Sequence, residues 1–171
     1  MTKGSVSSEA ALSFVLECLA GEGNMREGFR FTCPVRVRYS EVDRQEIVYY
    51  SRYLEYADVA HTEYFRAAGF EYQELIEQHG FDPSVVKAAI EYNLPARFDE
   101  ILQVHARVVA IGRTSFRMEF EVTREENGDA MAAVQIVYVN FDKATQASRP
   151  VPDSIRRGIE TFEGIPFPPS A

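Results

Sequence analysis

The chain has 171 residues, the length of one domain, and its 46% hydrophobic and 26% charged residues are typical of a globular protein and not of a disordered one. Its 18 Lys and Arg against 26 Asp and Glu give a formal net charge of −8, which argues against broad contact with a nucleic-acid backbone. No window approaches the roughly 18 consecutive apolar residues of a membrane span, so we expect a cytoplasmic protein that binds no membrane.

The first 30 residues differ from the rest of the chain and are predicted to form an N-terminal extension. Apolar residues recur at helical spacing within Glu9–Leu19, which predicts a short helix there. A glycine-rich stretch follows, with Gly21, Gly23 and Gly28. We therefore expect a single domain over residues 31–171.

The domain is predicted to begin with a strand and a long helix. Apolar and polar residues alternate over Phe31–Ser40, as in a strand that is buried on one face. From Ser51 the spacing becomes helical, and one stripe carries Tyr53, Ala57, Ala60, Tyr64 and Ala68. Ser51 is expected to cap this helix and Gly69 to end it. A shorter helix is predicted over Tyr72–Gln78.

Four further alternating segments predict strands that are mostly linked by hairpins. They cover Val86–Leu94, Leu102–Ala110, Phe116–Val122 and Ala133–Phe141. Asn127-Gly128 is a strong hairpin-turn signal between the last two, and a capped helix is predicted from Asp153 to Phe162. Because strands and helices do not alternate, the order favours an α+β fold with one antiparallel sheet curled around one central helix.

Several common kinds of active site are absent from the sequence. It has no GxSxG elbow and no HExxH motif, and His61, His79 and His105 lie too far apart to form a local metal site, so no metal is expected. We interpret His61 as a partly exposed helix residue. The two cysteines, Cys18 and Cys33, form no disulfide framework, and Cys33 is expected to pack as a small apolar group.

One carboxylate lies at the entrance of the predicted long helix. Asp43 precedes Tyr50 by seven residues, in the connection between the first strand and the helix. Free backbone N–H groups at a helix N-terminus favour developing negative charge, so an acid beside them could support acyl-transfer hydrolysis. An Asp in such a loop is more often a turn or cap residue, and the spacing does not exclude Glu41 and Glu46 as alternatives.

Three separated motifs carry a family resemblance. They are Arg36–Tyr56 (RVRYSEVDRQEIVYYSRYLEY), Glu91–Glu100 (EYNLPARFDE) and Gly112–Phe116 (GRTSF). In this order they resemble the hotdog-fold acyl-CoA thioesterases of the 4-hydroxybenzoyl-CoA thioesterase type, whose signature places Asp before Gly-(Ile/Val)-Val-aromatic at the entry to the central helix. The resemblance spans residues 31 to 141.

The resemblance implies a fold and an assembly. Hotdog proteins wrap an antiparallel sheet around a long central helix, which agrees with the strand order predicted above. Their subunits pair edge to edge, and the dimers often pair again into tetramers. Their active sites lie at the dimer interface, and the only coenzyme that they require is the CoA of the acyl-CoA substrate.

The resemblance also implies roles for individual residues. Asp43 matches the catalytic carboxylate, acting as nucleophile or general base. Tyr50 matches the residue whose backbone N–H polarises the thioester carbonyl. The matches for substrate binding are Arg113, Thr114 and Ser115, in a turn that contacts the CoA nucleotide, with Arg97 near that region.

One position departs from the family signature. Glu46 stands where the family has Gly, a residue that permits a tight turn with positive φ. This departure keeps open a second function, a non-catalytic protein that binds acyl-CoA without cleaving it. A third, a hotdog dehydratase, ranks last because such enzymes use a His a few residues after the Asp, and here none follows until His61.

Overall fold

The computed structural model describes residues 26–168; the helix predicted over Glu9–Leu19 and Cys18 lie outside them. Its strands are β1 (Phe31–Arg36), β2 (Pro83–Tyr92), β3 (Ile101–Ile111), β4 (Ser115–Arg124), β5 (Ala130–Asp142) and β6 (Ala147–Ser148). Its helices are α2 (Arg52–Ala67), α3 (Tyr72–Glu77) and α4 (Asp153–Glu163). None of the helices in the described part of the chain is long and apolar enough to span a membrane.

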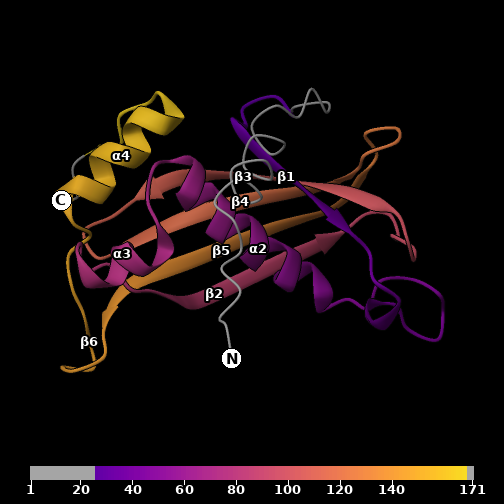
Figure 1. Ribbon diagram of the computed structural model, residues 1–171, viewed down its shortest axis with the longest axis horizontal. Coiled ribbons are helices and arrows are strands. Elements are labelled where there is room, and N and C mark those ends of the chain that lie inside the picture. The colour runs from indigo at the N-terminus through magenta and orange to yellow at the C-terminus, as the bar shows by residue number, and fades with distance from the viewer. Residues whose placement is uncertain (1–25, 169–171) are drawn as a thin grey trace, which may run out of the picture.

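The strands form one antiparallel sheet in the order β1-β3-β4-β5-β2, with β6 added to β5 (Figure 1). The α+β prediction is therefore confirmed. The predicted turn at Asn127-Gly128 joins β4 to β5, and Gly128 has a φ of +74° while its N–H donates to the carbonyl of Arg124.

The prediction that these strands are mostly linked by hairpins is confirmed for β3, β4 and β5, whereas β2 pairs with β5 at one side of the sheet and not with β3. The chain between β2 and β3 bonds to the segment that connects β1 to α2. Val37 N–H donates to the carbonyl of Glu100, and Val48 N–H donates to that of Ala96. These bonds bring β3 beside β1 instead of β2.

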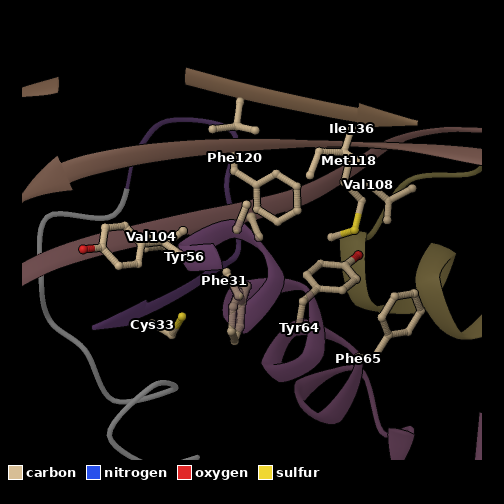
Figure 2. Close-up of a cluster of buried hydrophobic side chains, with 14 of the residues drawn as sticks. Phe31, Cys33, Tyr56, Tyr64, Phe65, Val104, Val108, Met118, Phe120 and Ile136 are labelled. Atoms are coloured by element: carbon tan, nitrogen blue, oxygen red, sulfur yellow. The ribbon is translucent and has the colours of Figure 1, made fainter. Parts of the chain in front are cut away.

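The helix α2 packs its predicted stripe against one face of the sheet (Figure 1). Ala57 and Ala60 are fully buried, and their small side chains let the helix approach closely. Figure 2 shows the aromatic rings of Phe31 and Tyr64 meeting in this layer, with their centroids 5.9 Å apart and edge to face. The sheet supplies the other side of the core, with Val104, Val108, Met118, Phe120 and Ile136.

The interpretation of His61 as a partly exposed residue is wrong. Its side chain is 3% exposed, and its ring stacks on that of Tyr138 at 4.7 Å and meets Phe65 edge to face at 5.0 Å. The buried face of α2 is wider than the predicted stripe because Phe65 and Tyr138 close over this flank as well. Burial lowers the pKa of His61 to about 4, so the ring is neutral.

Two local predictions near α2 also need correction. The first strand ends at Arg36, and Tyr39–Glu41 form a turn of 3-10 helix that leaves Tyr39 79% exposed. The strand stops because the carboxylate of Glu41 accepts a hydrogen bond from the backbone N–H of Arg38 and turns the chain. Ser51 occupies the N-cap position of α2 but has helical backbone angles and makes no side-chain cap bond.

The end of α2 and the C-terminal helix follow the predictions more closely. Gly69, with φ of +90°, follows the end of α2 as expected. The predicted C-terminal helix is present as α4, although its first residue is preceded by Pro152 and no side chain caps it. Arg156 donates to the carbonyls of Ile111 and Gly112, which fixes α4 beside the end of β3.

Candidate active site

The segment before α2 folds into a tight loop. Val42 and Val48 form an antiparallel bridge, and Asp43 N–H donates to the carbonyl of Ile47 at 2.9 Å. Glu46 closes the turn with a φ of +61° and donates its N–H to the carbonyl of Asp43. The loop therefore has the left-handed conformation for which the family signature uses Gly, although a Glu occupies the position.

Asp43 and Tyr50 line the same cleft, whose volume is about 340 Å³. The rest of its lining is mostly apolar or aromatic: Gln45, Ile47, Val48, Tyr53, Tyr92, Asn93, Leu94 and Pro95. Asp43 is half-buried, and its Oδ1 accepts a hydrogen bond of 2.7 Å from Gln45 N–H. Its Oδ2 makes no hydrogen bond to any other residue of 26–168, so one carboxylate oxygen is available to a ligand.

The two alternative carboxylates of this loop are arranged differently. Glu41 is 3% exposed and both of its carboxylate oxygens are bonded within the protein. Glu46 is exposed and does not line the cleft. Of the three acids in this segment, Asp43 alone lies on the wall of the cleft.

A tyrosine from β2 fixes the entrance of the helix. The hydroxyl of Tyr92 donates a hydrogen bond of 2.9 Å to the carbonyl of Tyr50. Burial and the neighbouring Tyr50 raise the pKa of Tyr92, so its hydroxyl remains protonated and able to donate. Sequence reasoning missed Tyr92, because it follows Tyr50 by 42 residues and nothing in the sequence indicates the contact.

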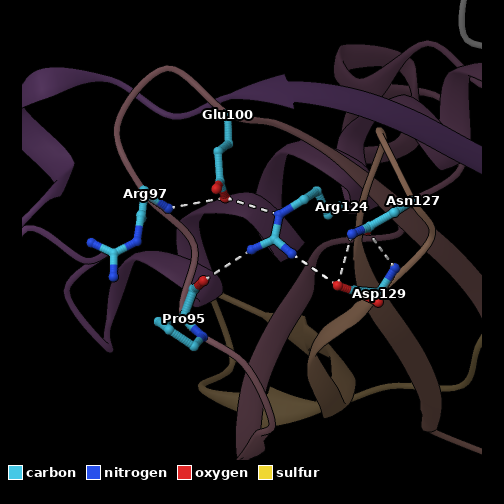
Figure 3. Close-up of polar contacts among 6 residues, drawn as sticks. All are labelled: Pro95, Arg97, Glu100, Arg124, Asn127 and Asp129. Atoms are coloured by element: carbon cyan, nitrogen blue, oxygen red, sulfur yellow. Dashed lines mark hydrogen bonds and ion pairs between the residues drawn. The ribbon is translucent and has the colours of Figure 1, made fainter.

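Arg124 holds Pro95, another residue that lines the cleft. Figure 3 shows its guanidinium between the carbonyl of Pro95, the carboxylate of Glu100 and that of Asp129, at 3.3, 3.4 and 3.0 Å. Arg97 lies in the same segment, where it bridges Ile47 and donates its N–H to Glu100. Arg97 therefore lies at the same end of the sheet as Asp43.

The turn predicted to bind the CoA nucleotide, Arg113–Ser115, lies at the other end of the sheet from the cleft. Arg113 and Thr114 accept backbone hydrogen bonds from Val151 and Asn140, at the end of the sheet beside α4 (Figure 1). The ten residues of β4 separate this turn from the cleft end, a distance of roughly 30 Å at about 3.3 Å per residue. One chain thus brings together Asp43, Tyr50 and Arg97, and holds Arg113, Thr114 and Ser115 apart from them.

Metal-binding clusters are not found in residues 26–168, where no three side chains of His, Cys, Asp or Glu come together. Cys33 is fully buried, as predicted.

Solved structures identify the class of fold. A thioesterase from Thermus thermophilus, crystallised with coenzyme A and Zn, is 30% identical and superposes with a TM-score of 0.71 over 83% of this chain and 100% of that one. The 1,4-dihydroxy-2-naphthoyl-CoA thioesterase Slr0204 from Synechocystis, at 21% identity, shares the fold with a TM-score of 0.69 over 75% of this chain and 94% of its own. The protein is a hotdog-fold protein.

Sequence comparison identifies the family. The model of the thioesterase-like superfamily matches residues 37–159. Acyl-CoA thioesterase YbgC from Haemophilus influenzae is 31% identical over 120 residues, which are 70% of this chain and 88% of that protein. The chain belongs to the thioesterase-like superfamily and is a thioester hydrolase, which favours the enzyme over the binding-only and dehydratase alternatives.

Proposed function

We propose that the protein hydrolyses an acyl-CoA thioester to the free acid and CoA in the cleft at the entrance of α2. The observation that carries this proposal is that Asp43 and Tyr50 line the same cleft. Relatives named as acyl-CoA thioesterases, from Haemophilus influenzae and Escherichia coli, support the substrate class. The reaction needs no cofactor, since CoA is part of the substrate.

The backbone N–H of Tyr50 is the proposed oxyanion donor. It makes no hydrogen bond to another residue of 26–168, and it lies two residues before the first turn of a 16-residue helix. The helix dipole and this N–H would both stabilise negative charge on the thioester oxygen. The bond from Tyr92 to the carbonyl of Tyr50 keeps that segment in one orientation.

Asp43 is the proposed catalytic carboxylate, acting as nucleophile or general base. In one route its carboxylate attacks the thioester carbon, the C–S bond breaks, CoA leaves as the thiolate, and water then hydrolyses the mixed anhydride. In the other route it takes a proton from a water molecule that attacks the same carbon, and CoA leaves in the same way. Both routes need the carboxylate oxygen that the protein leaves unbonded.

A second copy of the chain is proposed to complete the substrate site. The strand β2 pairs with β5 and lies at the edge of the sheet, where it exposes Val85 and Val86, each at 58%; an apolar edge strand is suited to pairing with an identical strand. Edge-to-edge pairing there, and pairing of the dimers into a tetramer, would place a partner copy beside the cleft. We propose that the nucleotide of CoA is bound by the Arg113–Ser115 turn of that partner copy.

The test of the catalytic proposal is the Asp43→Asn variant. Release of free thiol would be measured with acetyl-, hexanoyl-, palmitoyl- and benzoyl-CoA, with Glu46→Gln as the matched control from the same loop. We expect Asp43→Asn to lose at least about 10²-fold in kcat, the usual scale for a general base, and Glu46→Gln to retain activity. Thiol release by Asp43→Asn at the parent rate would refute the role of Asp43.

The nucleotide turn has a separate test. We expect Arg113→Ala to raise KM for a CoA ester more than for the matching N-acetylcysteamine thioester, which lacks the nucleotide. Equal changes for both substrates would remove the nucleotide-contact role from Arg113 and leave the role of Asp43 unaffected.

A further inference from the structure

We infer that Glu41 and Tyr56 are positioning residues, which together hold the Asp43 loop and the N–H of Tyr50 in their working geometry on α2. This inference rests on the proposed function of the cleft. Neither side chain lines the cleft. Both act through the backbone that carries the two cleft residues.

The carboxylate of Glu41 is fully engaged inside the protein. Its Oε2 accepts one hydrogen bond of 2.7 Å from the N–H of Arg38 and one of 2.9 Å from the hydroxyl of Tyr56. Its Oε1 is 2.9 Å from Nε of Arg38. A buried carboxylate with this many donors is stabilised in place, whereas loss of a donor leaves an uncompensated acceptor.

The backbone of Glu41 connects the two halves of the site. Its carbonyl accepts a hydrogen bond of 2.9 Å from the N–H of Tyr49, the residue before Tyr50. Asp43 follows two residues later along the chain. Glu41 therefore joins the start of the loop to its end. Asp43 lies two residues after one end of this hydrogen bond, and Tyr50 lies one residue after the other.

Tyr56 anchors this arrangement to the helix. It is 1% exposed on the buried face of α2, and its hydroxyl reaches Glu41 across the interior. Burial, and then the hydrogen bond to Glu41, raise the pKa of Tyr56, so the hydroxyl is protonated and able to donate at neutral pH. The hydrogen bond from Tyr56 thus fixes the position of the Asp43 loop relative to the N-terminus of α2.

The same helix supplies a matched control. The hydroxyl of Tyr64 donates to the buried carboxylate of Glu163 at 2.6 Å, and Glu163 also accepts from the N–H of Val108. Tyr64 lies eight residues after Tyr56, and its partner is at the end of α4, remote from the Asp43 loop. Replacing either tyrosine by Phe removes one buried tyrosine–carboxylate bond and keeps the ring.

The experiment compares kcat, KM and thermal unfolding of Tyr56→Phe and Tyr64→Phe in the full chain, with the panel ester that the parent turns over fastest. Misplacing a catalytic group by about 1 Å can cost 10²-fold, so we expect Tyr56→Phe to lose about ten- to a hundredfold in kcat with KM within about twofold of the parent. Tyr64→Phe should lose comparable thermal stability and keep kcat within about twofold. Equal losses of kcat in the two variants, or no loss in Tyr56→Phe, would overturn the inference.

Two substitutions of Glu41 decide the matter if Tyr56→Phe does not fold. Glu41→Gln keeps an oxygen for Tyr56 and Arg38, so its kcat should stay within about threefold of the parent, whereas Glu41→Leu should match the loss expected for Tyr56→Phe. Equal losses in both would assign the effect to the charge of Glu41 and refute positioning. Asp43→Asn in the same series separates the two proposals. Parent-level activity of Asp43→Asn would refute the catalytic role of Asp43, whereas the comparison of Tyr56→Phe with Tyr64→Phe tests the positioning role.

Discussion

Lowering the pH from about 7.5 to about 5 is expected to destabilise the protein through His61. The folded state holds this ring neutral between Tyr138 and Phe65, with a pKa of about 4, whereas an unfolded His titrates near its ordinary value of 6.5. Between these two values the unfolded chain binds a proton that the folded chain does not. The contribution of the neutral His61 to stability is therefore present above pH 6.5 and is lost as the pH falls toward 4.

The size of the effect follows from the difference between the two pKa values. Each unit of difference corresponds to about 1.4 kcal/mol, so the loss attributable to His61 reaches about 3 kcal/mol below pH 4. At pH 5 proton linkage gives a loss of about 2 kcal/mol relative to neutral pH. A globular protein is commonly stable by about 5–15 kcal/mol, so this loss is readily measured.

The assay is urea unfolding of the parent and of His61→Phe at the two pH values and at one fixed protein concentration. Phe keeps an aromatic ring against Tyr138 and cannot take up a proton. The stability of the parent relative to the variant should fall by about 2 kcal/mol at the lower pH. His105, whose pKa is also lowered to about 4, by burial and by Arg26, contributes equally to both proteins and cancels. A difference that does not change with pH would refute the reasoning.

Three further substitutions test the backbone and the cleft wall. Glu46→Gly removes the backbone strain of a non-glycine residue with positive φ and should raise the free energy of unfolding by up to about 1 kcal/mol in urea titrations. A lower free energy of unfolding would contradict the assigned turn. Gly158→Ala should lower it by about 1–3 kcal/mol, because a Cβ would overlap the ring of Phe70, and a more stable variant would show that the ring moves freely. Arg124→Met removes the donor to Pro95 and should speed amide exchange in residues 96–100; unchanged exchange would show that other contacts hold this segment.

The long periodic segments were predictable because one face of each is buried along its whole length. The alternation in β3 to β5 and the stripe from Tyr53 to Tyr64 correspond to side chains that the structure buries. The pairing of β2 was not predictable in the same way, since alternation gives the face of a strand and not its neighbour. The exposure of His61 was misjudged because its flank of α2 is covered by Tyr138 of β5, far along the chain.

The candidate site divides along similar lines. Asp43 and Tyr50 were predictable because both lie in one local motif at a helix entrance. Glu41 was identified as an acid of the right spacing, but its burial depends on Tyr56, whose hydroxyl reaches it only in the folded chain. Tyr92 lies in the Glu91–Glu100 motif, but nothing in that motif indicates its contact with Tyr50, which joins two segments far apart in the chain.

The separation of neighbouring strands along the chain has a consequence for the order in which the molecule folds. β3, β4 and β5 form a continuous meander. The outer strands pair over long loops, since Pro83 of β2 pairs with Asn140 and Phe31 of β1 pairs with Ala106. Closing such large loops is slow compared with forming hairpins. We expect the three-stranded meander to form early and the outer strands to attach late, so pulse-labelled amide exchange during refolding should protect β4 before β2.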